Sequence, residues 1–183
     1  LITATNGKIY TINQIYDYPQ MPKFAGIVIR GDILEKNNFD PKSIQTFDDL
    51  YNALKVIKQA TGQPPYAGRS GVSNIEYFAN MFGTSIHAPY YDNSQKKFTN
   101  PYVTQNLKDC VEYLYKLNKE GLLGDDWLTM NSSDWKTAIR SGKRFAYVDE
   151  VYTTDLNEAK FTEDLVKAGA KLEIIIPPKY NGK

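Results

Sequence analysis

Short apolar segments alternate with longer amphipathic segments along this chain, and this alternation limits the folds that it can adopt. Gly26-Ile27-Val28-Ile29-Arg30 and Phe145-Ala146-Tyr147-Val148 have the length and composition of buried strands. Between them, apolar residues recur at helical spacing. Helices that connect strands favour an α/β domain, so we predict a three-layer α/β/α arrangement with a mostly parallel sheet.

Capping residues and glycines indicate where the helices begin and end. Thr46 can cap a helix, Asp49 can reach back to complete a capping box, and Gly62 ends that helix. The Asn100-Pro101 pair predicts another helix start. Similar signals predict helices over residues 31–37, 46–61, 73–82, 100–120, 131–141 and 154–168, strands over 8–15, 66–69 and 172–176, and a small β-hairpin over 90–99.

Composition excludes several classes of protein. The 183 residues are 42% hydrophobic, which is enough for one domain with a real core. A net charge of +1 gives no electrostatic footprint for nucleic acid. Because His87 is the single histidine, a metal site built from several histidines is excluded, and we predict no metal and no cofactor. Cys110 lies on the apolar face of a predicted helix, so we expect a buried thiol.

Polar and aromatic residues follow the predicted strands at positions where a ligand could bind. In open α/β sheets, ligands bind beyond the carboxyl ends of the strands. Carboxylate, amide and guanidinium groups are planar and can bind two sugar hydroxyls at once, while a tyrosine ring can stack on the sugar face. We also expect Arg30 and Asp32 at this edge of the sheet. The predicted binding residues are Tyr16, Arg69, Asn74, Tyr77, Asp149, Glu150 and Tyr152.

Several of these residues also have a structural interpretation. Arg69 could be a solvated loop residue, and Asp149 or Glu150 could cap a following helix. Trp135 is expected in the core, since it shares a predicted helix with Ala138 and Ile139. Trp127 follows in a tight turn and is also expected to fill the core.

The chain resembles the second lobe of bacterial extracellular solute-binding proteins of family 1, the receptors of ABC sugar importers, especially the lipoprotein-type members. Four segments carry the resemblance in the order of the family, and the last of them contains Ile176-Pro177-Pro178-Lys179. The Gln63-Pro64-Pro65 stretch departs from the family, whose members often carry a longer polar loop there. The four segments are residues 6–10, 26–34 followed by 46–51, 114–122 followed by 138–143, and 176–179 followed by 181–183.

This resemblance implies a lobe of a type II periplasmic-binding-protein-like fold. Residues 1–183 would form one α/β lobe of a two-lobe protein, with residues 1–15 and 172–183 as strands that cross the hinge. The lobe would close with a missing first lobe on an oligosaccharide or similar polar solute, for delivery to the membrane subunits of an ABC importer. The location would be extracytoplasmic, as a membrane-anchored lipoprotein or a periplasmic protein.

Two other functions remain open from the residues alone. A glycosidase could use Asp149 or Glu150 with a second carboxylate, although adjacent residues rarely serve as the acid and base of one site. A structural domain without a small ligand is the third hypothesis. We favour a binding protein that is not an enzyme, because no catalytic pair is evident.

Overall fold

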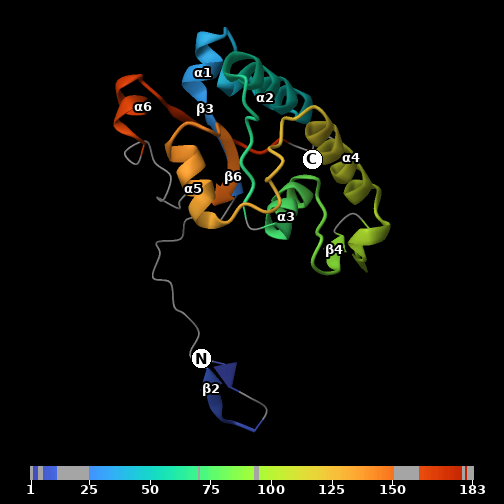
Figure 1. Ribbon diagram of the computed structural model, residues 1–183. Helices are drawn as coiled ribbons and strands as arrows, with labels where there is room; N and C mark the ends of the chain where they lie inside the picture. The colour runs from blue at the N-terminus through green and yellow to red at the C-terminus, as the bar shows by residue number, and fades with distance from the viewer. Residues whose placement is uncertain are drawn as a thin grey trace.

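The computed structural model describes residues 2–3, 6–11, 25–69, 71–92, 95–150, 161–178 and 180. The central strand of its main sheet is β3 (Ala25–Arg30), which lies between β6 (Ala146–Glu150) and β7 (Leu172–Ile175). Figure 1 shows β3 and β6 at the centre of the molecule. β3 runs antiparallel to both neighbours, and Ile27 lies opposite Val148 on one side and opposite Ile175 on the other.

The α/β class is confirmed, but the prediction of a mostly parallel sheet is wrong. All strand pairs in the described part of the chain are antiparallel, and parallel pairing occurs only as isolated bridges from Tyr66 to Leu123 and Ala146. The alternation of strands and helices does not fix strand direction here. The partners of β3 come from the far end of the chain, so no single crossover helix sets their orientation.

Six α-helices occur in the described residues, and their start signals are partly as predicted. The capping box is confirmed, since Thr46 Oγ1 accepts from the Asp49 N–H at 3.1 Å and Asp49 Oδ2 accepts from the Thr46 N–H at 2.9 Å. Gly62 ends this helix with φ of 70°. The helices are α1 (Gly31–Lys36), α2 (Phe47–Thr61), α3 (Val72–Met81), α4 (Gln105–Lys119), α5 (Ser132–Arg140) and α6 (Glu163–Lys167).

Two predicted helix starts differ from the structure. Asn100 caps a short 3₁₀ turn, η2 (Pro101–Val103), while α4 begins later with Thr104 as its N-cap. Proline at the first position therefore starts a turn that does not continue into the long helix. The N-cap of α3 is Gly71, so Ser73 lies inside the helix. A second 3₁₀ turn, η1 (Pro41–Ser43), precedes α2.

Two hairpins accompany the main sheet. The predicted hairpin is confirmed as β4 (Tyr90–Asp92) paired with β5 (Lys97–Thr99). Near the N-terminus, β1 (Ile2–Thr3) pairs with β2 (Ile9–Thr11), which confirms part of the strand predicted over residues 8–15. Residues 12–15 and 154–160 lie outside the described residues, while α6 confirms a helix in the second half of the region predicted over 154–168.

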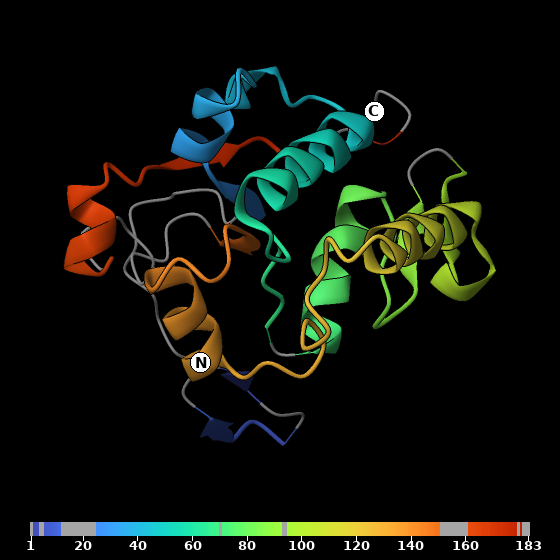
Figure 2. The same ribbon diagram turned by 45° about the horizontal axis from the view of Figure 1, so that its top comes forward.

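The sheet separates two apolar clusters. Successive residues of a strand point to opposite faces, so Ile27 and Ile29 enter one cluster while Val28 enters the other. Side chains of α2, α3 and α4 fill the first cluster, which contains Trp127. Side chains of α5 fill the second, which contains Trp135. Both tryptophans are buried as predicted, and α3 and α5 lie on opposite sides of β6 in Figures 1 and 2.

The single cysteine and the single histidine are placed as expected. Cys110 is buried within the first cluster, and this burial raises the pKa of its thiol to about 12. A thiol with such a pKa stays protonated near neutral pH and behaves as a small apolar side chain. His87 is exposed. No helix of the described residues is both long enough and apolar enough to cross a membrane.

A buried ion pair closes one end of the sheet. Arg30, the last residue of β3, donates from Nε to Asp32 Oδ1 at 2.7 Å, and both residues are buried. The backbone N–H of Lys171 donates to the same carboxylate at 3.0 Å. Burial opposes the charge of Asp32, but these hydrogen bonds outweigh it, so the pKa of the Asp32 carboxyl lies below its ordinary value. The pair ties β3, α1 and the start of β7 together.

Replacing Asp32 with alanine leaves the Arg30 charge buried without its partner. We expect the Asp32→Ala variant to lose about 3 to 5 kcal/mol of unfolding free energy near neutral pH, measured by urea denaturation. The folded-state pKa of the Asp32 carboxyl is lowered. The ionised carboxylate therefore adds its full share to the free energy of unfolding above the unfolded-state pKa, and this stabilisation is lost as pH falls. The difference between wild type and variant therefore narrows below about pH 4.

The exposed pair of Asp48 with Lys116, at 3.8 Å, provides the control. We expect Asp48→Ala to change stability little, because an exposed pair is screened by solvent. Equal effects of the two substitutions would contradict a structural role for the buried pair.

Candidate functional site

The antiparallel register decides which strand ends meet at one edge of the sheet. β6 ends at Glu150, opposite Ala25 where β3 begins. The segment from Tyr66 to Arg69 runs parallel to β6, with the Ala67 N–H donating to the Ala146 carbonyl at 2.8 Å. Arg69 therefore lies toward the end of β6. We call this edge, formed by Arg69, the start of α3 at Gly71–Val72, and Asp149–Glu150, the Arg69 edge.

Arg30 and Asp32 do not share this edge, which corrects the prediction. β3 ends at Arg30, whose N–H donates to the carbonyl of Phe145, just before β6 begins. Because β3 and β6 run in opposite directions, Arg30 lies at the other end of the sheet from Glu150. Both members of the pair are buried and bind each other, which gives them a structural role.

Arg69 packs against an aromatic ring. Its guanidinium carbon lies 4.6 Å from the centroid of the Trp135 ring. Trp135 belongs to α5 and is itself held edge-to-face by Tyr147, at 5.1 Å between ring centroids. A cation above an aromatic face is attracted by the ring quadrupole. The half-buried Arg69 side chain is therefore fixed in position by the second apolar cluster. Nothing in the sequence pattern indicates this contact.

Asn74 does not lie on an accessible surface. Its side chain is 1% exposed, and its Oδ1 accepts a hydrogen bond from the hydroxyl of Tyr66 at 2.5 Å. The predicted exposure of this amide is therefore wrong. The cause is the actual start of α3 at Val72, which turns the third residue of the helix toward the sheet. Asn74 fastens α3 to the Tyr66 segment. Tyr77 is half-buried and packs against the first apolar cluster.

The other predicted binding residues are described only in part or not at all. Asp149 and Glu150 occupy β6, with their backbones opposite Gly26 and Ala25. That register places both residues at the Arg69 edge. Tyr16 and Tyr152 lie outside the described residues.

The first turn of α3 adds hydrogen-bond donors to the Arg69 edge. Gly71 is the N-cap with φ of 57°, and because glycine has no side chain it makes no side-chain hydrogen bond to the first N–H groups of the helix. Backbone N–H groups at a helix start, with the positive end of the helix dipole, favour anionic or oxygen-rich ligands. The backbone of Gly68, just before this turn, packs closely against that of Trp127, and a Cβ at Gly68 would overlap the Trp127 carbonyl. Val72 is 57% exposed beside these donors.

Metal binding receives no support from this geometry. In the ranges that the structure describes, no three His, Cys, Asp or Glu side chains gather in a way that could hold an ion. The Arg69 edge instead combines a positioned guanidinium, helix-terminal donors and two acidic residues. Such a set binds a polar solute through hydrogen bonds.

Comparisons with known proteins identify relatives of the same kind. No family model matches the sequence. The Polygalacturonan/rhamnogalacturonan-binding protein YtcQ of Bacillus subtilis (strain 168) is 27% identical over 177 residues, which cover 93% of this chain and 33% of YtcQ. Lipoprotein LipO of the same organism is 26% identical over 159 residues, which cover 80% of this chain and 30% of LipO. This chain is similar to part of an extracellular solute-binding protein.

Solved structures show the same fold. The alginate-binding protein AlgQ2 superposes with a TM-score of 0.75 at 24% identity over 97% of this chain and 37% of AlgQ2. The maltose-bound MalE3 of T. maritima gives a TM-score of 0.63 at 16% identity over 87% of this chain and 39% of MalE3. The periplasmic-binding-protein-like α/β fold and the predicted family resemblance are confirmed. The chain spans about a third of the length of the curated relatives it matches.

The hydrogen bond between Tyr66 and Asn74 allows the structural role of Asn74 to be tested. Tyr66→Phe leaves the buried amide oxygen of Asn74 without this donor. We expect a loss of about 1 to 3 kcal/mol in the free energy of unfolding, measured by urea denaturation, because the unpaired group keeps its desolvation cost.

The matched control is Tyr102→Phe, since the exposed hydroxyl of Tyr102 donates to the Ile86 carbonyl at 2.6 Å. Water can replace that hydroxyl, so we expect a much smaller loss. If Tyr66→Phe kept its stability but bound ligand less tightly, the structural role of Asn74 would be contradicted and Asn74 would belong to the ligand-binding surface.

Proposed function

We propose that this chain is one lobe of an extracytoplasmic solute-binding protein that captures an oligosaccharide for an ABC importer. The observation that carries the proposal is the similarity of 93% of the chain to one third of a polygalacturonan/rhamnogalacturonan-binding protein. Two thirds of that relative lie outside the match, which is room for a second lobe. The whole of residues 1–183 would belong to the lobe described here.

Strand directions support closure of two lobes across the Arg69 edge. β3 begins at this edge, and β7 runs antiparallel to β3, so β7 ends there. The segments before β3 and after β7 therefore leave the sheet beside the candidate binding residues. We propose that residues 1–15 and 172–183 contribute to a hinge at this edge. Rotation about such a hinge would bring a second lobe over the ligand.

The groups at the Arg69 edge fit a saccharide, and two of them, the Arg69 guanidinium and the start of α3, can bind its carboxylates. A guanidinium can bind a carboxylate or two hydroxyls through parallel hydrogen bonds, and Trp135 holds that of Arg69 in place. The uncapped start of α3 also attracts negative charge. Asp149 and Glu150 would accept hydrogen bonds from sugar hydroxyls. Alginate and polygalacturonan, in the names of two of the relatives, are acidic polysaccharides.

Binding without turnover is the function that the relatives support. YtcQ and AlgQ2 are both named as binding proteins. We propose the same for this chain, with the membrane subunits of an ABC importer as its partners. The lipoprotein relative supports a location outside the cytoplasm, either anchored to the membrane or periplasmic.

Arg69 provides the direct test of this site. In the two-lobed protein, we expect Arg69→Ala to weaken binding of trigalacturonate about tenfold or more and binding of maltotriose less, as measured by calorimetric titration. The reason is that only the acidic sugar loses a charge-assisted hydrogen bond. Arg69→Lys should retain part of the affinity for trigalacturonate, because it keeps the charge without the planar fork.

Lys108→Ala is the matched control, since Lys108 forms an exposed pair with Glu112 on α4. It removes one positive charge far along the chain from Arg69 and should leave both affinities unchanged. Unaltered trigalacturonate binding by Arg69→Ala would refute the assignment of Arg69. Failure of the unsubstituted protein to bind any oligosaccharide would refute the proposed function itself.

A further inference from the structure

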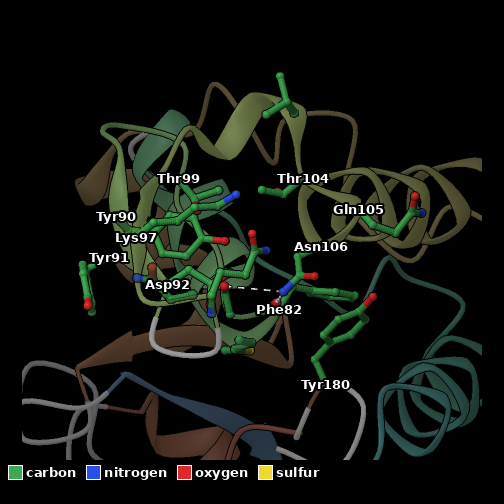
Figure 3. A pocket seen from close by; sticks show the side chains of 15 residues that line it. Phe82, Tyr90, Tyr91, Asp92, Lys97, Thr99, Thr104, Gln105, Asn106 and Tyr180 are labelled. Carbon is green, nitrogen blue, oxygen red and sulfur yellow. Dashed lines mark hydrogen bonds between the residues drawn. The ribbon is translucent and has the colours of Figure 1, made fainter.

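An open cavity lies at the opposite end of α3 from the Arg69 edge. The groove has a volume of about 840 Å³ and is formed by the last turn of α3, the β4–β5 hairpin and the start of α4. Tyr180 lines it beside α3, as Figure 3 shows. The ten residues of α3 span about 15 Å, so the groove is separate from the Arg69 edge. The proposed function does not use it.

The hairpin presents two different faces. Tyr90 pairs with Thr99 and Asp92 pairs with Lys97, and residues directly opposite in register share a face. All four of these residues line the groove. Phe98 lies on the other face, where its ring contacts that of Tyr91 edge-to-face with 5.5 Å between centroids, and Tyr91 is also among the residues that line the groove. The groove face therefore offers the ring and hydroxyl of Tyr90, the hydroxyl of Thr99 and a pair of opposite charges.

Thr99 carries an unsatisfied group at the wall of the groove. The residue is only 9% exposed, and its Oγ1 has no hydrogen-bond partner in the described part of the protein. A buried hydroxyl without a partner costs free energy, whereas valine would fill the same space without that cost. Such a group calls for an explanation, and a ligand that completes its hydrogen bond provides one.

The wall opposite the hairpin is held in place. Asn106 Nδ2 donates to the carbonyl of Phe82 at 2.8 Å, which fixes the amide and leaves its Oδ1 as an acceptor. The ring of Tyr180 packs against that of Phe82 at 5.0 Å, and the Tyr180 hydroxyl donates to Asp109. Figure 3 shows Asn106 and Tyr180 on the same side of the groove. These side chains therefore require little ordering when a ligand binds.

We propose that this groove is a second saccharide-binding site, for a short neutral stretch of a glycan chain. Aromatic rings suit the apolar face of a sugar, while a hydroxyl and an amide suit its hydroxyl groups. The opposed Asp92 and Lys97 leave the hairpin face without net charge. The residues that line the groove come from α3, the hairpin, the start of α4 and the segment at Tyr180.

The test is a titration of the protein with maltotriose, and separately with xylotriose, followed by amide chemical shifts in NMR spectra. We expect at least one of the two sugars to shift the resonances of Tyr90, Thr99 and Asn106 in a saturable manner. We expect Thr99→Val to retain the wild-type melting temperature or raise it, because an unpaired hydroxyl is removed. The same substitution, and Tyr90→Ala, should weaken the saturable binding about tenfold.

Phe98→Ala is the matched control, since Phe98 lies on the other face of the hairpin and is 75% exposed. It should leave the groove affinity unchanged, and so should Arg69→Ala. Absence of saturable shifts at the groove with both sugars would overturn the proposal, as would equal affinities of wild type, Thr99→Val and Tyr90→Ala. Arg69→Ala tests only the Arg69 edge, through its effect on trigalacturonate binding. The groove is tested by the shifts of Tyr90, Thr99 and Asn106, so the two proposals can fail independently.

Discussion

The pairing of β3 with two antiparallel neighbours is the constraint on which the rest of this structure depends. Ile27 and Ile29 face one apolar cluster and Val28 faces the other, so one strand organises both sides of the fold. The same pairing brings the start of β3 beside the ends of β6 and β7. A parallel arrangement would have placed Arg30 next to Glu150.

The two ends of the sheet consequently have different chemistry. At one end, Arg30 and Asp32 bind each other, are buried and neutralise each other. At the other end, Arg69 rests on the ring of Trp135 near the uncapped start of α3. Polar groups that bind each other in the interior stabilise a fold, whereas a side chain held in place at the end of a sheet can also contact a ligand. This contrast supports a binding function at the second end.

Local features of the fold could be predicted from the sequence, because neighbouring residues determine them. The capping box of Thr46 and Asp49, the helix end at Gly62 and the hairpin over residues 90–99 depend on contacts within a few positions. The burial of Cys110 and Trp135 followed from helical periodicity. The family resemblance also came from ordered local segments.

Features that depend on distant contacts could not be predicted in the same way. The direction of β3 depends on partners from the last quarter of the chain. The burial of Asn74 follows from the start of α3 at Val72, which makes Asn74 the third residue of the helix, and from a hydrogen bond to Tyr66. The stacking of Arg69 on Trp135 and the unpaired hydroxyl of Thr99 have no signature in the sequence pattern.

Cross-strand nuclear Overhauser effects between backbone protons of β3, β6 and β7 test the central claim most directly. The account predicts contacts of Val28 with Tyr147 and with Ile174. Along β3, each later residue should contact a residue with a lower sequence number in β6 and in β7. A series in which partner numbers rise together with those of β3 would show parallel strands. That result would place Arg30 beside Glu150, move the start of β3 away from the end of β6, and contradict the proposed binding edge.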